Sequence, residues 1–314
     1  MKHTTGIHHI TAIVGNPQEN VDFYSGVLGL RLVKKTVNFD DPGTYHLYFG
    51  NEEGAPGTIM TFFPWSNAHD GVIGSGQVGV TSFVVPTGSL SFWKKRLDKF
   101  SVENGEMTRF GEKVLAFDDP HGLHLELVER EEGEPNTWSF GGVSTKHAIK
   151  GFAGATLLSG KPESTMTVLE EVLGFMRVAE EEDFVRFKSS DAIGNTIDVK
   201  KTPLSSGRMG SGTVHHIAFR ANDFNDHEEW RNLLEEKEYG PTPVVDRQYF
   251  NAIYFREEGG ILFEIATDPP GFAKDEDPDE MGKKLLLPPW LEEKRSQIER
   301  VLEPANARVL DGDK

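Results

Sequence analysis

The sequence contains no cysteine. This absence excludes disulfides, thiolate metal sites, iron–sulfur clusters and cysteine nucleophiles. If the protein binds a transition metal, histidine and carboxylate side chains must hold it.

Basic residues are a minority, since 33 Lys and Arg stand against 50 Asp and Glu, and the formal net charge is −17. A field of that sign repels nucleic-acid phosphates and anionic lipid, so we expect neither nucleic acid nor a membrane as partner. No apolar run approaches the roughly 20 residues of a membrane span, and the first residues lack the apolar stretch of a signal peptide. We expect a cytoplasmic protein that binds small molecules, with a homodimer left open.

The sequence also repeats itself. Three pairs of segments align internally: 7–33 with 152–178, 74–83 with 210–219, and 117–126 with 255–264. The first pair predicts a strand, a Gly-x-Pro turn, and a helix that ends at Val-Leu-Gly. The third pair predicts a hairpin with an acidic, Gly-containing turn.

These pairs divide the chain into four units of the order strand–helix–strand–strand–strand. The predicted units are residues 6–64, 75–130, 148–202 and 210–268, with helices near 89–100 and 225–237 in the second and fourth. Residues 129–143, rich in Gly and Glu, are the predicted linker between halves. In the tail, 269–314, we predict a helix over 288–302 that begins at proline.

The four units differ at two equivalent positions. The first-strand position holds His9, Val80, Gly154 and His216 in turn, and the last-strand position holds Thr61, Glu126, Asp198 and Glu264. Imidazole is therefore retained only in the first and fourth units. A lone strand histidine is more often packed or exposed than a ligand, but two at equivalent positions beside a glutamate favour a metal site.

Two imidazoles and one carboxylate are the ligand set of non-haem Fe(II) oxygenases, and Mn(II) accepts the same set. We therefore predict a metal site at His9, His216 and Glu264, with positions left open for substrate and dioxygen. Because Thr61 has no carboxylate, it leaves free a coordination position of the metal that a carboxylate at this place would fill. The second and third units lack imidazole, so we expect no transition metal there, and Glu126 is predicted to be a remnant or a surface residue.

Each predicted ligand histidine follows another histidine. Neighbours on a strand point to opposite faces, so we assign His9 and His216 as ligands and leave His8 and His215 as either acid/base groups or exposed residues. The other histidines are predicted to be structural or solvent-facing: His3, His46, His69, His121, His124, His147 and His227.

Three segments resemble the vicinal oxygen chelate superfamily of glyoxalases, bleomycin-resistance proteins and extradiol dioxygenases. They are His8-His9-Ile10-Thr11, residues 23–30 and residues 260–264. The resemblance covers about the whole chain and is greatest to bacterial ring-cleaving dioxygenases of the hydroquinone type. It implies an α+β fold of four βαβββ modules in two open, barrel-like mixed sheets flanked by helices, plus the C-terminal helical tail.

The same resemblance implies that modules 1 and 4 form the metal-bearing half. The common two-domain catechol dioxygenases instead use a histidine of the third module, where this chain has Gly154. The hydroquinone type carries further active-site groups, which match His8, Thr11, His215, Arg247 and Tyr254 in this sequence.

The implied activity is Fe(II)-dependent ring cleavage of a hydroquinone or catechol, with both atoms of O2 incorporated, in detoxification. His8 or His215 would transfer protons, Tyr254 would orient the oxygen species, and Arg247 would stabilise negative charge. The candidate pocket walls are Phe62, Phe63, Trp65 and Phe250. Two alternatives stay open, a glyoxalase-like isomerase, against which Thr61 counts, and a metal-free protein that binds an aromatic or a drug.

Overall fold

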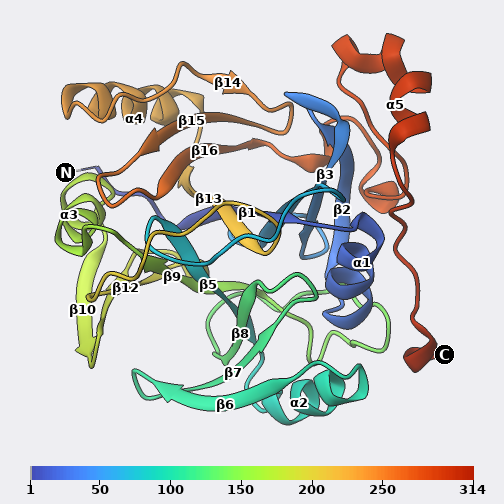
Figure 1. Cartoon of the computed structure of the whole chain (residues 1–314), viewed down its shortest axis with the longest axis horizontal. Coiled ribbons are helices and arrows are strands. Elements are labelled where there is room, and N and C mark those ends of the chain that lie inside the picture. Colours follow the sequence, from blue (N-terminus) through green and yellow to red (C-terminus); the bar gives the residue numbers. More distant parts are fainter. Residues whose placement is uncertain (1) are drawn as a thin grey trace.

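The computed structural model describes residues 2–314, which form two curled, eight-stranded mixed sheets (Figure 1). The strand order is β14-β15-β16-β13-β1-β4-β3-β2 in the first sheet and β10-β11-β12-β9-β5-β8-β7-β6 in the second. The first sheet thus joins strands from the two ends of the chain, and the second joins strands from its middle. The predicted α+β fold class is confirmed.

The strands of the first sheet are β1 Ile7–Val14, β2 Arg31–Asn38, β3 Asp41–Gly50, β4 Ile59–Pro64, β13 Thr213–Ala221, β14 Val245–Asp246, β15 Phe250–Arg256 and β16 Leu262–Pro270. Those of the second are β5 Gln77–Val85, β6 Asn104–Arg109, β7 Glu112–Asp118, β8 His124–Glu129, β9 Gly151–Leu158, β10 Met176–Glu181, β11 Phe184–Lys188 and β12 Thr196–Lys200. Each sheet is held at its centre by an antiparallel pair, β1 with β13 and β5 with β9.

Each first strand leads into a helix. The helices are α1 Pro17–Val21, α2 Leu90–Lys99, α3 Pro162–Thr167 and α4 Phe224–Glu236, and α1 and α3 continue as π-helical turns over Asp22–Val27 and Val168–Val172. Proline at the first position of α1 and α3 fixes the backbone angle that a helix start needs. Fully buried Trp93 of α2 and Trp230 of α4 fasten these helices to the core, where burial of such large apolar area is strongly favourable.

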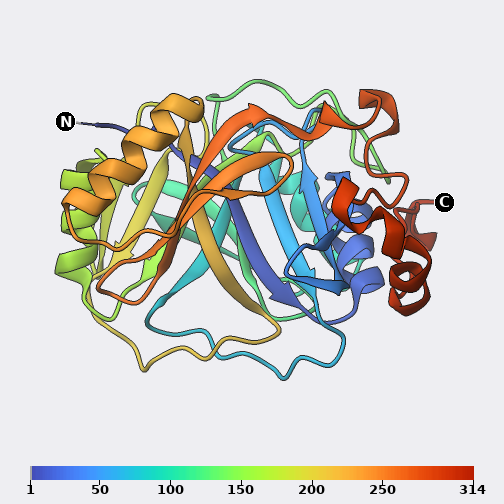
Figure 2. The ribbon, with the colours of Figure 1, turned by 90° about the horizontal axis from the view of Figure 1, so that it is seen from above.

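The tail lies at the opposite end of the molecule from α3 and α4 (Figure 2). Its predicted helix consists of a 3₁₀ segment, Pro289–Lys294, followed by α5, Arg295–Val301. Pro288 and Pro289, at the start of this segment, cannot donate backbone hydrogen bonds. This is consistent with a first half that is a 3₁₀ helix, which is wound more tightly than an α-helix. The end of the tail is anchored to α2, where the Asp313 carboxylate accepts from Arg96 at 2.7 Å and from Lys99 at 2.8 Å.

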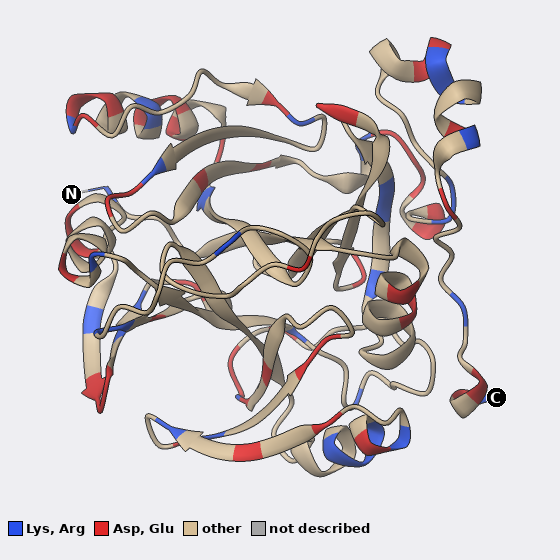
Figure 3. Ribbon diagram, viewed as in Figure 1, with Lys and Arg blue, Asp and Glu red and all other residues tan. Residues whose placement is uncertain are grey.

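Charges of both signs are mixed along α2, α4 and α5 (Figure 3). Among the helices of residues 2–314, none has the length and apolar character needed to span a bilayer.

The middle of the second sheet contains a buried charge cluster. Glu126 is 3% exposed and accepts two hydrogen bonds from Arg109, at 2.9 and 2.6 Å. Arg186 donates in the same way to Asp198, at 2.8 and 2.9 Å. Of the two alternatives predicted for Glu126, the surface residue is therefore wrong, because Arg109 supplies the counter-charge that makes its burial tolerable. The alternative of a remnant stays a prediction.

We predict that Arg186→Met lowers the free energy of unfolding by about 3 kcal/mol, because buried Asp198 loses both hydrogen bonds from Arg186 and keeps only the 3.3 Å contact with Arg109 Nε, a side chain that also neutralises Glu126. Arg177→Met is the matched control, since Arg177 pairs with Glu180 on the surface, where both side chains are nearly half exposed. The control should lose less than about 1 kcal/mol. Chemical denaturation of both variants measures the difference, and equal losses would contradict the assignment of a buried cluster.

Candidate metal centre

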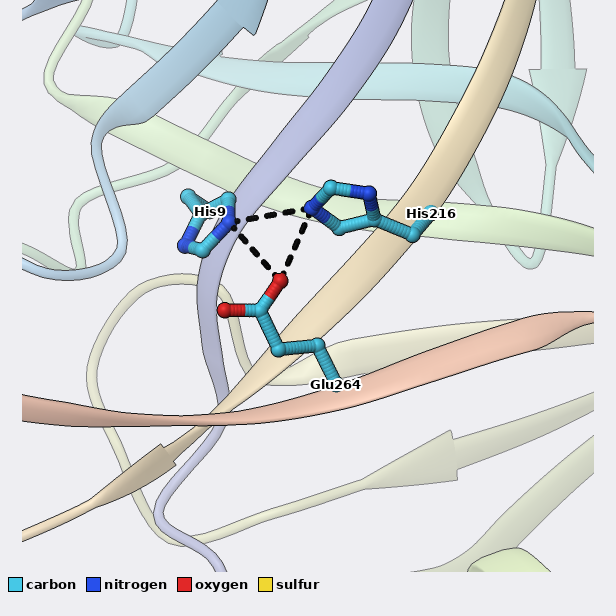
Figure 4. A group of neighbouring side chains, drawn as sticks. All are labelled: His9, His216 and Glu264. Atoms are coloured by element: carbon cyan, nitrogen blue, oxygen red, sulfur yellow. Dashed lines mark hydrogen bonds and ion pairs between the residues drawn. The ribbon is translucent and has the colours of Figure 1, made fainter. Parts of the chain in front are cut away.

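Three adjacent strands of the first sheet bring His9, His216 and Glu264 to one point (Figure 4). β1 lies antiparallel to β13, with His9 opposite Ala218, and β13 lies parallel to β16, with Ala218 opposite Glu264. His216 enters from the position opposite Thr11. Strand pairing therefore fixes the positions of all three side chains.

The three side chains approach through one atom each. Nε2 of His9 lies 3.3 Å from Nε2 of His216 and 3.3 Å from Oε2 of Glu264, and the His216–Glu264 distance is 2.8 Å. Ligands that bind one ion at right angles, each about 2.1 Å from it, lie about 3 Å apart. The observed triangle thus has the dimensions of three ligands on one face of a transition metal.

The carboxylate of Glu264 supports the same interpretation. It is fully buried, and neither of its oxygens receives a well-aligned hydrogen bond from any group within residues 2–314. Burial would raise the pKa of Glu264, but the adjacent His9 and His216 hold that pKa well below its ordinary value. Burial also lowers the pKa of His216 and favours its neutral form, which is the form that binds metals. A buried carboxylate facing two imidazoles is a donor set that fits a divalent cation.

Both neighbouring histidines occupy β-bulges. The β1–β13 register skips His8 between Ile7 and His9, and it skips His215 between Val214 and His216. A bulge re-aims the extra residue, so His8 Nδ1 lies 2.9 Å from His9 Nδ1 and His215 Nδ1 lies 2.8 Å from His216 Nδ1. The simple alternation of faces assumed from the sequence does not separate the two rings of each pair.

A cavity of about 240 Å³ opens beside the three atoms. Of the predicted aromatic walls, Phe63, Trp65 and Phe250 line it, and the Phe250 ring lies 4.9 Å from that of His9. Phe62 was predicted wrongly, because it points into the core and packs against Tyr24 and Phe49.

Three of the other predicted site residues also line this cavity: His215, Arg247 and Tyr254. Arg247 donates from Nε to the Tyr254 hydroxyl at 3.2 Å and from Nη1 to Asp40 at 2.9 Å. Burial, together with the charge of Glu264, raises the pKa of Tyr254, so its hydroxyl keeps its proton. Burial lowers the pKa of His215 to about 3, which keeps this imidazole neutral.

His46 belongs to the site, although the sequence predicts a structural or solvent-facing residue. It lines the cavity from β3, and burial lowers its pKa well below the ordinary value. Its Nε2 lies 2.6 Å from the Thr61 hydroxyl, which in turn lies 3.2 Å from the Thr11 hydroxyl, and its Nδ1 lies 2.8 Å from the Tyr48 hydroxyl. Thr11, Thr61, His46 and Tyr48 thus form a hydrogen-bonded chain that begins on β1.

The remaining histidines of the described chain lie outside this cavity: His3, His69, His121, His124, His147 and His227. Buried His227 contacts the backbone carbonyl of Ile265 from α4, whereas His124 pairs with Asp118 on the surface. These two contacts agree with the structural or exposed roles expected for them.

The chain matches the family model described as the glyoxalase/bleomycin resistance protein/dioxygenase superfamily, over residues 6–127 and 151–265. It is 65% identical to MhqO of Bacillus subtilis (strain 168), whose name assigns it provisionally as a ring-cleaving dioxygenase, and the match covers 99% of each chain. It is 34% identical to the chlorohydroquinone/hydroquinone 1,2-dioxygenase of Sphingobium indicum, over 95% of each chain.

Two solved structures also resemble this chain. A crystal structure from Bacillus subtilis, provisionally named a dioxygenase, superposes with a TM-score of 0.98 at 65% identity and covers 99% of this chain and 100% of that one. Glyoxalase I from Zea mays superposes with a TM-score of 0.60 at 14% identity, covering 84% and 92% of the two chains. The second likeness shows the shared fold alone.

We predict that His9→Ala loses bound divalent metal while keeping its fold, because the site loses one of three ligands, whereas the lost ring lines a cavity and is not part of the hydrophobic core. His124→Ala, which removes an exposed histidine, should keep the metal content of the unchanged protein. Elemental analysis after anaerobic purification measures the metal, and circular dichroism checks the fold. Full metal content in folded His9→Ala would place the metal elsewhere.

Proposed function

The chain belongs to the glyoxalase/bleomycin resistance protein/dioxygenase superfamily, and within it we propose that this protein is an Fe(II)-dependent dioxygenase that opens the ring of hydroquinones. The observation that carries this proposal is the triangle of two imidazole nitrogens and one carboxylate oxygen beside an aromatic-walled cavity. Thr61 occupies the position in the first unit that is equivalent to Glu264 in the fourth, and it offers no carboxylate as a further ligand. Relatives named as ring-cleaving and hydroquinone dioxygenases support the same assignment.

His9, His216 and Glu264 would hold the metal, and Fe(II) is the ion that this ligand set favours for oxygen chemistry, with Mn(II) accepted by the same groups. The chemistry that Fe(II) supplies when bound is acidification of a substrate hydroxyl and electron transfer between the ring and dioxygen. We propose extradiol-like cleavage beside a hydroxyl-bearing carbon, with both oxygen atoms incorporated. The associated biological role would be detoxification of quinones and hydroquinones.

The histidine pairs define where protons reside. When Nε2 of a neutral imidazole is a ligand, the proton sits on Nδ1. His216 would then donate from Nδ1 to Nδ1 of His215, and His9 would donate likewise to His8. His215 is left with an N–H on Nε2, and because it lines the cavity it can donate to a substrate oxygen. This pairing also holds each ligand ring in a fixed orientation.

Tyr254 and Arg247 supply the other donors at the cavity. Since Arg247 already donates to the Tyr254 oxygen, the phenolic proton is available to a second acceptor, such as a substrate or dioxygen oxygen. The guanidinium adds a fixed positive charge where negative charge develops during ring opening. Thr11 would hold Thr61 and His46 in place through the hydrogen-bonded chain.

The cavity limits the substrate. About 240 Å³ is below the usual range of roughly 300–1,000 Å³ for drug-sized ligands, which favours a single ring. Phe63 and Phe250 can pack against the faces of the substrate ring, while His215 and Tyr254 can donate hydrogen bonds to its oxygen substituents.

We expect protein purified without oxygen to contain iron and to consume about one O2 for each hydroquinone opened. An oxygen electrode with a panel of hydroquinones and catechols, followed by mass spectrometry of the ¹⁸O2-labelled product, measures this stoichiometry. Zinc or nickel with turnover of a methylglyoxal–thiol adduct would instead indicate an isomerase. A metal-free protein without turnover would indicate a binding protein.

We further predict that Thr61→Glu reduces oxygenase turnover by about tenfold or more, because a second carboxylate would act as a fourth ligand and fill an open coordination position. Thr61→Gln has the same length and also breaks the contact with His46, but its neutral amide is a weaker ligand. Steady-state oxygen uptake by the two variants separates ligation of the metal by the carboxylate from the loss of the contact with His46. Equal rates in Thr61→Glu and Thr61→Gln would mean that this position does not face the metal.

A further inference from the structure

A second cavity, of about 330 Å³, lies where the first unit meets the linker and the tail. The first unit contributes Ser25, Arg31 and Lys35, the linker contributes Trp138 and Phe140, and the tail contributes residues near Met281 and Asn306. None of these residues lines the cavity at the metal centre.

Two cations are buried at this cavity without a counter-charge. Arg31 is 6% exposed and Lys35 is 7% exposed, yet no carboxylate oxygen of residues 2–314 lies within ion-pair distance of either. Arg31 donates to the backbone carbonyls of Glu52 and Pro278, and Lys35 donates to the carbonyl of Ala305 and the side chain of Asn306. Burying unpaired positive charge is costly, and it is unexpected in a chain with a net charge of −17.

Three buried polar atoms of the lining residues also lack partners within the described chain. They are Oγ of Ser25, Nε of Arg31 and Nε1 of Trp138. Ser25 is 1% exposed, and the Arg31 guanidinium lies 4.9 Å from the Trp138 ring. All three can donate a hydrogen bond. The residues that line this cavity therefore carry two positive charges and three donors without a partner, one of which belongs to Arg31 itself.

The rest of the wall is mostly apolar, and its other polar side chains are Asn306 and Lys283, which pairs with Glu280. Trp138 stacks with Phe140, with ring centroids 6.3 Å apart, and Leu30, Leu32 and Met281 also line the cavity. We propose that this cavity binds a small organic carboxylate with an apolar or aromatic body, at a site separate from the metal centre. Arg31 and Lys35 neutralise the carboxylate, Ser25 and Trp138 donate to its oxygens, and the aromatic wall covers the body.

Benzoate is a suitable probe, with benzamide as its uncharged isostere. We expect benzoate to change the tryptophan fluorescence of the full-length protein with one-site saturation, and benzamide to bind at least about tenfold more weakly, because charge-assisted hydrogen bonds are the stronger ones. Trp138→Phe should remove most of the fluorescence change, although four other tryptophans remain of the five.

Ser25→Ala is the decisive variant, because its hydroxyl has no partner to lose and the fold should be unaffected. It should weaken benzoate binding about tenfold by calorimetry, and Lys35→Met should weaken it at least as much. Lys94→Met, at an exposed surface pair, and His9→Ala, at the metal centre, should bind benzoate as the unchanged protein does. The proposal is overturned if benzoate does not bind at millimolar concentration, if benzamide binds equally well, or if Ser25→Ala is without effect.

Discussion

The metal centre depends on the pairing of β1 with β13. This pairing brings His9 within 3.3 Å of His216, although the two are 207 residues apart in the sequence, and β16 then adds Glu264 from the far side of β13. A slip of one residue in a strand register would turn its side chains to the other face, so the backbone hydrogen bonds of the sheet determine whether a site exists. Ligands held on strands are also positioned more rigidly than ligands on loops.

The second sheet has the same backbone pattern as the first but holds arginine–carboxylate pairs where the first holds the candidate metal ligands. Its central pair, β5 with β9, has register shifts that skip Gly79 and Ala153, the repeat equivalents of His215 and His8. A Cβ at Gly154, the equivalent of His9, would overlap the carbonyl oxygen of Thr196, so a histidine has no room there. The carboxylates of Glu126 and Asp198 remain, but arginines neutralise them. The backbone pattern, bulges included, is common to both sheets, while their charges have diverged.

The sequence predicts the fold and the equivalences between units because an internal repeat carries the same residue into the same strand position. His9, Gly154 and His216 can be recognised as equivalent from the repeat alone, without knowing which strands pair in the folded chain. The structure then brings the three predicted ligand side chains together, and it adds what alternation along an ideal strand does not describe. His8 and His215 approach their neighbours only because each occupies a bulge.

Other features depend on contacts that the local sequence pattern does not specify. His46 joins the site through Thr61 and Tyr48 on paired strands, and nothing in its local sequence distinguishes it from a surface histidine. Phe62 and Phe63 are adjacent aromatics, so composition alone does not say which one faces the core. The burial of Glu126 follows from Arg109 on another strand.

X-ray diffraction from crystals of the iron-loaded protein, recorded on both sides of the iron absorption edge, is the sharpest test of the metal centre. We predict one anomalous peak at bonding distance from Nε2 of His9, Nε2 of His216 and a carboxylate oxygen of Glu264. Iron bound at any other place, or these three side chains without iron in an active crystal, would contradict it.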